Sequence, residues 1–342
     1  MRIIRDQLVN ILASLKPGLA KKDLIQQMSH FIFTGHDICT YNDRTCIIYP
    51  YETDFKCSVK GEELYKVLYG VSEDEVDMIV ENNYLKIGSK KLKAGLSTLI
   101  DEKEKVEPMI NSIKRSLKKL EFEPLPTNFL DGSFLCMFST AKDMTKGVLN
   151  CVCYHDENIF STDSLRVSHF KMNRPVKFSL IHFKNVIDMV KFPIVETALG
   201  TSWIHFKTSD GVLFNCRVLL EEYPEHIENY FNVTGKKISL PKKLKEVIET
   251  VTVLAEGEID TERVIKVEIA NNEIKCTAKK ERGWIENSTE IEYKDKLITF
   301  YINPIFFAQI LDRATDMVVE QNTALFVTET FKHVISLLPM EE

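Results

Sequence analysis

One pattern of apolar and polar residues occurs three times along this chain of 342 residues. Residues 60–99 are typical of a short amphipathic helix, an acidic turn and strands with alternating apolar positions, and the same order returns at residues 178–220 and 300–338. Matching strand positions are Leu85, Ile204 and Leu325, which lie 119 and 121 residues apart. Because this period is too long for a solenoid repeat, we expect three copies of one domain.

The first half of each copy also begins with a helical pattern that strands follow. These helices are expected at residues 5–16, 131–147 and 241–254, and a short strand is expected before the first of them. The predicted fold class is therefore α+β, with two helices packed on small antiparallel sheets in each domain. A Pro-containing stretch at residues 122–129 and a turn at residues 232–235 predict domains at residues 1–121, 122–233 and 234–342.

The composition, 44% hydrophobic and 27% charged, is typical of a globular protein. The apolar runs are far shorter than the roughly 20 residues of a membrane span, so we expect a cytoplasmic protein without membrane contact. A net charge of −6 argues against a protein that holds nucleic acid by overall attraction to phosphates. Any contact with DNA must be local or enforced by topology.

No catalytic or metal-binding motif is recognisable. The sequence lacks GxGxxG, GxxxxGK[ST], GxSxG and HExxH, and its eight cysteines form no CxxC pair. The His36-Asp37 and His155-Asp156 pairs are typical of solvated turns. We therefore expect a protein that is not an enzyme, with buried reduced cysteines and with neither a metal nor another cofactor.

Four segments resemble the beta sliding clamp of bacterial DNA polymerase III and its phage relatives. These are YLKIGSKKLKAGLSTL (84–99), FSTDSLRVS (160–168), EEYPEHIENYF (221–231) and LLPM (337–340), in the family's order along essentially the whole chain. Two departures are clear: Ser164 stands where the family has a glycine, and Glu341 and Glu342 stand where it ends in Arg-Leu. The short length favours a phage relative over a bacterial protein.

The resemblance implies a polymerase processivity factor. Two three-domain subunits would join head to tail in a closed ring around duplex DNA, so that the ring slides without tight contacts and an acidic protein is compatible with DNA. Basic residues near the expected hole are candidates for DNA contact, although such residues often only solvate a helix face. They are Arg5, Lys16, Lys21, Lys22, Lys142, Lys146, Lys242, Lys243 and Lys245.

The resemblance also implies an apolar pocket between the second and third domains that takes a short peptide of the polymerase or clamp loader. The matching positions are Leu149, Thr162, Ser164, Leu165, Arg166, Val167, Pro224, Asn303, Phe306, Leu337, Leu338, Pro339 and Met340. Closure of the homodimer should pair an edge strand of the first domain with one of the third. The apolar candidates for that interface are Val106, Met109, Ile110, Val253 and Leu254.

Three alternatives remain open at this point. The chain could be an enzyme of DNA metabolism without a recognisable motif, or a clamp-like module that binds proteins without closing a ring. A homotrimeric ring of two-domain subunits is disfavoured, because three domains per chain require two chains for a six-domain ring.

Overall fold

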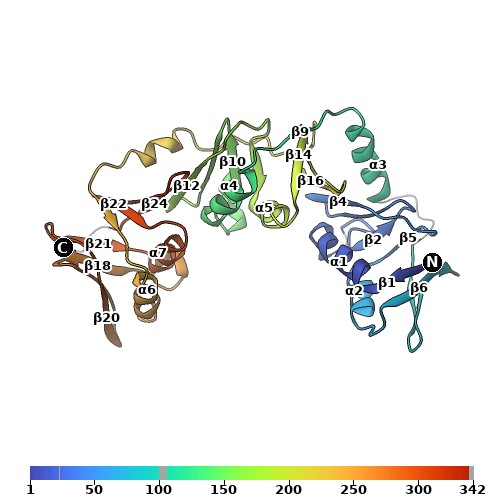
Figure 1. Cartoon of the computed structure of the whole chain (residues 1–342), viewed down its shortest axis with the longest axis horizontal. Coiled ribbons are helices and arrows are strands. Elements are labelled where there is room, and N and C mark those ends of the chain that lie inside the picture. The colour runs from blue at the N-terminus through green and yellow to red at the C-terminus, as the bar shows by residue number, and fades with distance from the viewer. Residues whose placement is uncertain (23, 100–105, 339–342) are drawn as a thin grey trace. The chain divides into compact units, whose positions relative to one another are not determined.

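The helices and strands follow one order that occurs three times in the computed structural model, which describes residues 1–22, 24–99 and 106–338 (Figure 1). The first copy contains β1 (Arg2–Ile4), α1 (Arg5–Leu15), β2 (His30–Phe33), β3 (Asp37–Tyr41), β4 (Thr45–Pro50), β5 (Cys57–Lys60), α2 (Gly61–Tyr69), β6 (Glu75–Glu81), β7 (Tyr84–Gly88) and β8 (Lys93–Ser97). The second contains β9 (Glu123–Pro124), α4 (Phe129–Cys136), β10 (Cys151–His155), β11 (Asn158–Thr162), β12 (Arg166–Lys171), β13 (Leu180–His182), α5 (Phe183–Met189), β14 (Ile194–Leu199), β15 (Trp203–Thr208) and β16 (Leu213–Arg217). The third contains β17 (Lys237–Ser239), α6 (Leu244–Thr252), β18 (Ile265–Ala270), β19 (Glu273–Lys280), β20 (Gly283–Glu290), β21 (Ile298–Ile302), α7 (Pro304–Leu311), β22 (Asp316–Glu320), β23 (Thr323–Val327) and β24 (Phe331–Ser336).

The three sequence landmarks occupy one structural position. Leu85, Ile204 and Leu325 lie in β7, β15 and β23, each the middle strand of the three that follow the second helix of its copy, and all three are buried. The α+β fold and the threefold pattern predicted from the sequence are therefore confirmed. In the described part of the chain, no helix is long and apolar enough to cross a membrane.

The sheets extend across the boundaries between copies, which the sequence did not predict. One sheet has the order β5-β2-β3-β4-β16-β15-β14-β9, and its central pair joins β4 of the first copy to β16 of the second. Likewise, β12 of the second copy pairs with β24 of the third in the run β10-β11-β12-β24-β23-β22-β17. The two outer sheets are β1-β6-β7-β8 and β20-β19-β18-β21. The two sheets expected inside the second copy are thus each completed by a neighbouring copy.

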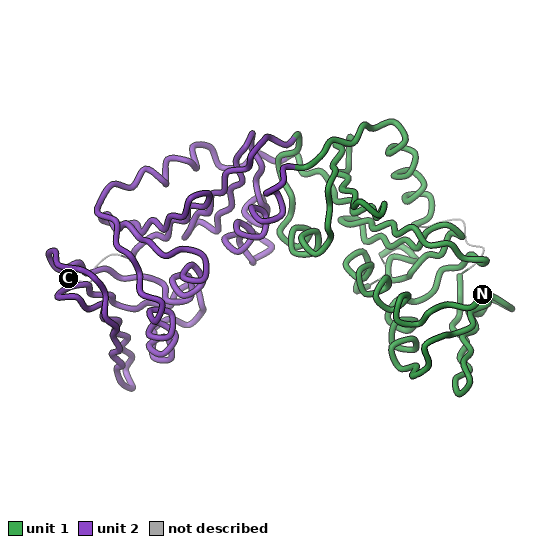
Figure 2. Tube along the Cα trace, in the orientation of Figure 1, with its two compact units in different colours: residues 1–125, 177–220 green, residues 126–176, 221–342 purple. Residues whose placement is uncertain are grey.

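This sharing of strands divides the chain into two compact units (Figure 2). Unit 1 comprises residues 1–125 and 177–220, and unit 2 comprises residues 126–176 and 221–342. Each unit contains one outer copy and half of the middle copy, because the central pairs β4·β16 and β12·β24 hold those parts together. The domain boundaries predicted from the repeat describe the order of the sequence, and they stay a prediction.

The expected helix at residues 131–147 is wrong. Helix α4 ends at Cys136, the 3₁₀ turn η2 (Met137–Ser139) follows, and a second 3₁₀ segment, η3 (Met144–Asn150), begins after an extended stretch. Local side-chain hydrogen bonds favour this break: Thr140 Oγ1 donates to Met137 O over 2.8 Å, and Asp143 Oδ1 accepts from Thr145 N over 2.9 Å. Lys142 and Lys146 are therefore not one turn apart on one helix face.

The segment expected to supply an edge strand of the first domain is also different. Val106, Met109 and Ile110 lie on α3 (Val106–Leu117), whose apolar residues recur at helical spacing. Val106 and Ile110 are buried in a core cluster with Met28 and Trp203, and Met109 packs against it. These three residues are therefore unavailable for an edge-strand interface.

Val253 and Leu254 likewise do not lie on a strand, because they follow the last residue of α6, Thr252. Val253 is nevertheless 73% exposed. The side chain of Leu254 reaches toward Gly283 at the start of β20, 4.0 Å from the position that a Cβ would take there. This end of α6 therefore adjoins the outermost strand of its sheet.

A half-buried histidine of β12 predicts sensitivity to acid. His169 stacks on Phe160, its Nε2 lies 2.8 Å from Asn158 Oδ1, and burial with the nearby Lys332 and Lys171 charges lowers its pKa to about 4. An unfolded chain has a histidine pKa of about 6.5 and takes up a proton that the folded protein does not. The free energy of unfolding should therefore fall as the pH drops from about 6.5 to about 4.

This pH dependence can be measured by urea unfolding of the wild type and a His169→Gln variant at several pH values. The variant should show a shallower fall across that window. His155→Gln provides the control, because it removes an exposed histidine of β10 without touching the His169 contacts. If the pH dependence of the free energy of unfolding is the same in His169→Gln as in the wild type, His169 is not the group responsible for it.

Candidate functional site

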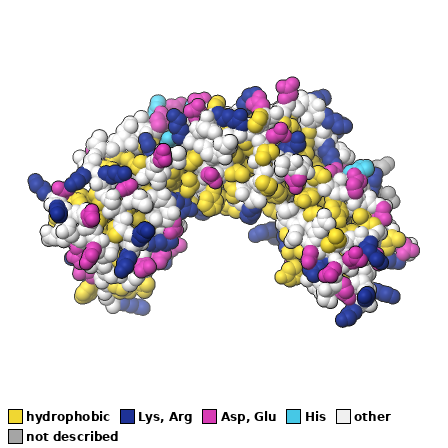
Figure 3. All heavy atoms as spheres, viewed as in Figure 1, with side chains coloured by type: hydrophobic (Ala, Val, Ile, Leu, Met, Phe, Trp, Pro, Cys, Tyr) yellow, Lys and Arg dark blue, Asp and Glu magenta, His cyan; other side chains and the backbone are white. Residues whose placement is uncertain are grey.

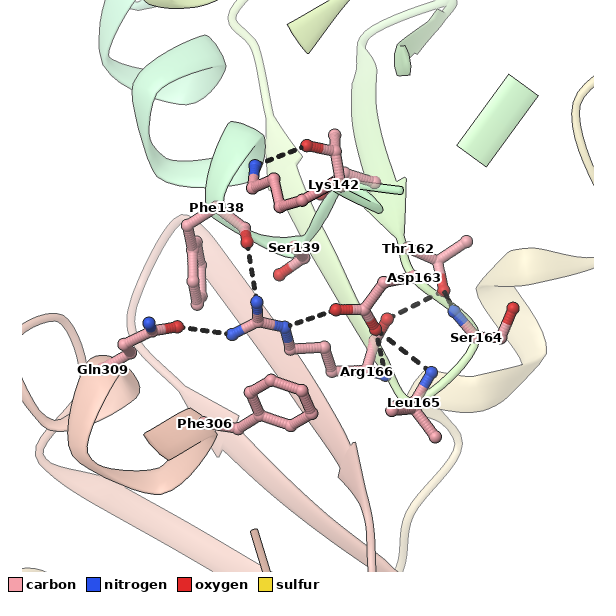
Figure 4. A network of polar contacts seen from close by, with 12 residues as sticks. Phe138, Ser139, Lys142, Thr162, Asp163, Ser164, Leu165, Arg166, Phe306 and Gln309 are labelled. Atoms are coloured by element: carbon pink, nitrogen blue, oxygen red, sulfur yellow. Dashed lines mark hydrogen bonds and ion pairs between the residues drawn. The ribbon is translucent and has the colours of Figure 1, made fainter. Parts of the chain in front are cut away.

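Several of the residues matched to the partner pocket lie around one buried arginine of unit 2. Arg166 begins β12, is 6% exposed, and donates to three acceptors (Figure 4). Its Nε reaches Asp163 Oδ2 over 2.9 Å, Nη1 reaches Gln309 Oε1 over 2.6 Å, and Nη2 reaches Phe138 O over 2.8 Å. Its Cζ also lies 4.0 Å from the ring centroid of Phe306. The guanidinium group therefore ties β12 to α7 and to the segment after α4.

The turn before Arg166 is fixed by its own polar side chains. Asp163 Oδ1 accepts from the backbone N–H groups of Leu165 and Arg166, each over 3.1 Å. Thr162 Oγ1 accepts from Ser164 N over 3.1 Å and donates to Arg166 O over 2.8 Å. Ser164 has φ +77°, a left-handed conformation that favours glycine, which agrees with the glycine that relatives are expected to carry there. The turn leaves the side chain of Leu165 exposed.

The end of the described chain lies beside this turn. Ser336 N donates to Leu165 O over 2.9 Å, and Val167 pairs with Val334 in the β12·β24 ladder. Leu337 is buried, whereas Leu338 is 37% exposed and donates its N–H to Tyr301 O over 2.9 Å. Leu165 and Leu338 thus give this end of the sheet exposed apolar side chains. Pro339 and Met340 lie outside the described residues.

The remaining pocket positions lie on neighbouring segments. Pro224 is exposed and follows Tyr223, whose hydroxyl accepts from Thr162 N over 3.1 Å. Leu149 is half-buried in η3. Asn303 is buried, caps α7 through Ile305 N and Phe306 N, and donates to Asp260 O. Asn303 therefore has a structural role at the start of the helix that carries Phe306.

Sequence reasoning missed the partners of Arg166. Phe138, Asp163 and Gln309 come from three separate segments, and only the folded chain brings them together. Lys142 also belongs to this neighbourhood: it donates to Thr140 Oγ1 over 2.9 Å, and loss of solvation together with the Arg166 charge lowers its pKa to about 8. The position of Asp163 in the TDSLR segment was the one signal that could have identified a partner.

The basic residues matched to DNA contact fall into two groups. Arg5 and Lys245 form ion pairs within the chain, with Asp6 over 2.6 Å and with Asp312 over 2.6 Å, and Lys16 Nζ lies 3.0 Å from the ring centroid of Tyr65. The other members, Lys21, Lys22, Lys142, Lys146, Lys242 and Lys243, are exposed, and Lys142 is the one that lies near Arg166. On the face shown in Figure 3, Lys and Arg side chains are interspersed with Asp and Glu.

The cysteines give no indication of a metal or redox centre. All eight are buried and free, and burial raises the thiol pKa of Cys39, Cys57 and Cys276 to about 12. Within the described ranges, no group of three or more His, Cys, Asp or Glu residues could hold a metal ion.

The fold is similar to that of solved bacterial replication proteins. The DNA polymerase III beta subunit from Thermotoga maritima aligns with a TM-score of 0.80 over 99% of each chain, at 16% identity. A sliding clamp from Bartonella birtlesii bound to griselimycin aligns with a TM-score of 0.83 over 99% of each chain, at 12% identity. The beta subunit from Pseudomonas aeruginosa gives 0.79 over 99% of this chain and 100% of that chain, at 14% identity. The sequence matches no protein-family model and no curated protein. The chain therefore has the fold of the bacterial DNA polymerase III beta subunits.

Proposed function

We propose that this protein is a DNA sliding clamp, a non-enzymatic ring that tethers a replicative polymerase to duplex DNA. The observation that carries the proposal is the threefold element order from β1 to β24, together with the alignment of 99% of the chain to two beta subunits at TM-scores of 0.79 and 0.80. The three sequence repeats, residues 1–121, 122–233 and 234–342, are on this proposal the three clamp domains. Two copies of the chain form the ring.

The charge of the chain fits encirclement better than tight binding. A net charge of −6 disfavours bulk attraction to phosphates, whereas a closed ring needs only local positive charge to keep the duplex centred. Exposed lysines, namely Lys21, Lys22, Lys146, Lys242 and Lys243, are the favoured DNA contacts, together with Lys16. Arg5 and Lys245 contribute less on this proposal, because carboxylates of the chain pair with them.

The proposed subunit contact joins β8 of one copy to β20 of the other. In the described ladders, β8 pairs only with β7 and β20 only with β19, so each leaves a strand edge for another chain. The segment around β8 is basic, with exposed Lys90, Lys91 and Lys93, and β20 carries exposed Glu290 together with Glu286, which also pairs with Lys275. Charge complementarity therefore favours a head-to-tail dimer, in which β8 pairs with β20, over a dimer in which two β8 strands or two β20 strands pair.

The proposed attachment site for the polymerase and the clamp loader is the surface beside Arg166. The exposed Leu165 and Leu338 provide apolar contact area, and the turn between β11 and β12 is held rigid by its own hydrogen bonds. A preformed apolar surface with few free torsions suits a short peptide with aliphatic or aromatic anchors.

Retention on DNA tests the proposal. The protein, loaded by its clamp loader onto nicked circular DNA, should stay bound through gel filtration at a salt concentration that abolishes phosphate contacts, and linearising the circle should release it. The expected difference is at least tenfold, because only topology holds the ring. Equal retention on circular and linear DNA would contradict encirclement.

A further inference from the structure

The turn that builds the partner site in unit 2 has a close counterpart in unit 1. Between β3 and β4, Asn42 Oδ1 accepts from Arg44 N over 3.2 Å and from Thr45 N over 2.9 Å. Between β11 and β12, Asp163 Oδ1 accepts from the equivalent groups, the backbone N–H groups two and three residues after it. The next residue is left-handed in both turns, with φ +72° at Asp43 and +77° at Ser164.

The strand beside each turn is attached in the same way. Arg217 N, at the end of β16, donates to Arg44 O over 3.0 Å, as Ser336 N, at the end of β24, donates to Leu165 O over 2.9 Å. The pairs β4·β16 and β12·β24 are thus equivalent joints between consecutive copies. The unit 1 joint therefore has a surface that corresponds to the proposed partner site.

A pocket of about 340 Å³ lies at this unit 1 joint. Its lining comes from α3, through Met109, Ser112 and Ile113, from Tyr41 and Asp43 at the turn, and from the loop and strand residues Gly200 to Trp203 with His205 and Arg217. The volume is at the lower end of the range for ligand pockets and suits one large side chain.

A charged pair and an aromatic ring form one wall of the pocket. Arg217 donates from Nη2 to Asp43 Oδ1 over 2.8 Å and from Nε to Asp43 O over 2.9 Å. Its Cζ lies 4.5 Å from the ring centroid of Trp203. The Arg217 hydrogen bond holds the pKa of the Asp43 carboxyl below its usual range. The guanidinium group, about a third exposed, is therefore fixed over the indole rather than free in solvent.

His205 adds a buried hydrogen-bond acceptor to the lining. Asn215 Nδ2 donates to Cys46 O over 2.8 Å, so Asn215 Oδ1 faces His205 Nδ1 at 2.7 Å and accepts a hydrogen bond from its N–H group. Burial lowers the pKa of His205, and the ring is therefore neutral at pH 7, with an unprotonated Nε2. His205 is 1% exposed, and its Nε2 has no hydrogen-bond partner among the described residues. A buried acceptor in a pocket lining favours a ligand that carries a donor.

The surroundings of the pocket are basic. Arg44 in the turn, and Arg115, Lys118 and Lys119 in and after the last turn of α3, are exposed. The exposed acidic residues nearest in sequence are Asp43, which Arg217 neutralises, Glu107 at the other end of α3, Glu121 two residues after Lys119, and Glu123, which pairs with Lys177. The excess of positive charge favours an acidic partner.

We propose that this unit 1 pocket is a second peptide site, which takes a tryptophan side chain from an acidic segment of a partner protein. The inference rests on the proposed function only in taking the unit 2 joint as a partner site. The indole packs against Met109, Ile113 and Trp203 and donates its N–H toward His205, while flanking carboxylates lie near the basic residues of α3. This site differs from the unit 2 site, whose exposed contacts, Leu165 and Leu338, are aliphatic.

The protein has two tryptophans, which provide an internal control. In a ¹⁵N-labelled sample, unlabelled peptide EEWEE, blocked at both ends, should shift the indole N–H signal of Trp203 and leave that of the exposed Trp284 unchanged. The peptide KKWKK should bind at least tenfold more weakly, and EEAEE should not bind. The 1-methyltryptophan form of EEWEE should bind about threefold to tenfold more weakly, because it lacks one hydrogen bond. A Trp203 signal that does not respond to EEWEE would overturn the proposal, as would equal binding of KKWKK.

Ser112, an exposed residue of α3 in the pocket lining, provides matched variants. Ser112→Glu should weaken EEWEE binding about threefold and Ser112→Lys should strengthen it by a similar factor. A Leu338→Ala variant should leave the Trp203 response intact, which separates the two sites; loss of that response would place the peptide elsewhere and overturn the proposal. Retention on circular DNA, measured on the same samples, reports on the clamp function independently of the Trp203 signal.

Discussion

Replacing Arg166 by Met is expected to lower the free energy of unfolding by about 3–5 kcal/mol. The substitution removes the cation that donates a hydrogen bond to the Asp163 carboxylate, and that side chain is 12% exposed. It also leaves Phe138 O and Gln309 Oε1 without this donor. Unpaired buried acceptors cost more than the bond itself contributes, so the loss should exceed that of an ordinary core substitution.

Urea unfolding followed by circular dichroism measures this effect. Arg217→Met provides the matched control, since it breaks a similar Asp–Arg pair whose arginine is 38% exposed and should cost only about 1 kcal/mol. Adding Asp163→Asn to Arg166→Met should recover part of the loss by removing the uncompensated charge. A loss of 1 kcal/mol or less in Arg166→Met would show that the network does not hold this part of unit 2 together.

Replacing Trp284 by Asp is expected to dissociate the proposed dimer. Trp284 lies on the edge strand β20 and is 69% exposed in the single chain, so the substitution should leave the folded subunit intact. A large aromatic residue that becomes buried in an interface commonly contributes about 2 kcal/mol, which corresponds to a rise of about 30-fold in the dissociation constant. The same variant should lose its retention on circular DNA.

Sedimentation at several protein concentrations checks this prediction. Leu220→Asp is the control, because Leu220 is 87% exposed and lies outside both edge strands. A wild-type protein that stays monomeric at micromolar concentration would contradict the ring altogether. If Trp284→Asp dimerises as strongly as the wild type, the subunit contact lies somewhere other than β20.

The parts of the fold that sequence predicted depend on local periodicity. Alternating residues around Leu85, Ile204 and Leu325 identified the strands, and apolar spacing at residues 5–16 identified α1 almost to its ends. Periodicity could not predict that β4 would pair with β16, since that pairing joins residues about 170 positions apart. Pairing between copies depends on the whole fold, whereas alternation along a strand does not.

The errors at residues 131–147 and 106–110 have separate causes. Thr140 and Asp143 bond to nearby backbone groups and end a helix that the apolar spacing alone would continue. Apolar character alone favours an edge position for Val106 and Ile110, but their helical spacing buries them. For the candidate site, the TDSLR segment located the turn, and the contacts with Phe138 and Gln309 required the folded chain.

The interleaved makeup of the two units has a consequence for the order in which the chain can fold during synthesis. Unit 1 needs residues 177–220 to complete the sheet that contains β4, but residues 126–176, which belong to unit 2, leave the ribosome before them. Residues 126–176 therefore emerge before residues 221–342, with which they form unit 2, have been synthesised. Because domains fold as units, stable structure in unit 1 should appear only after Leu220 has emerged, and a pause in translation before that point would prolong exposure of the unpaired edge of β4.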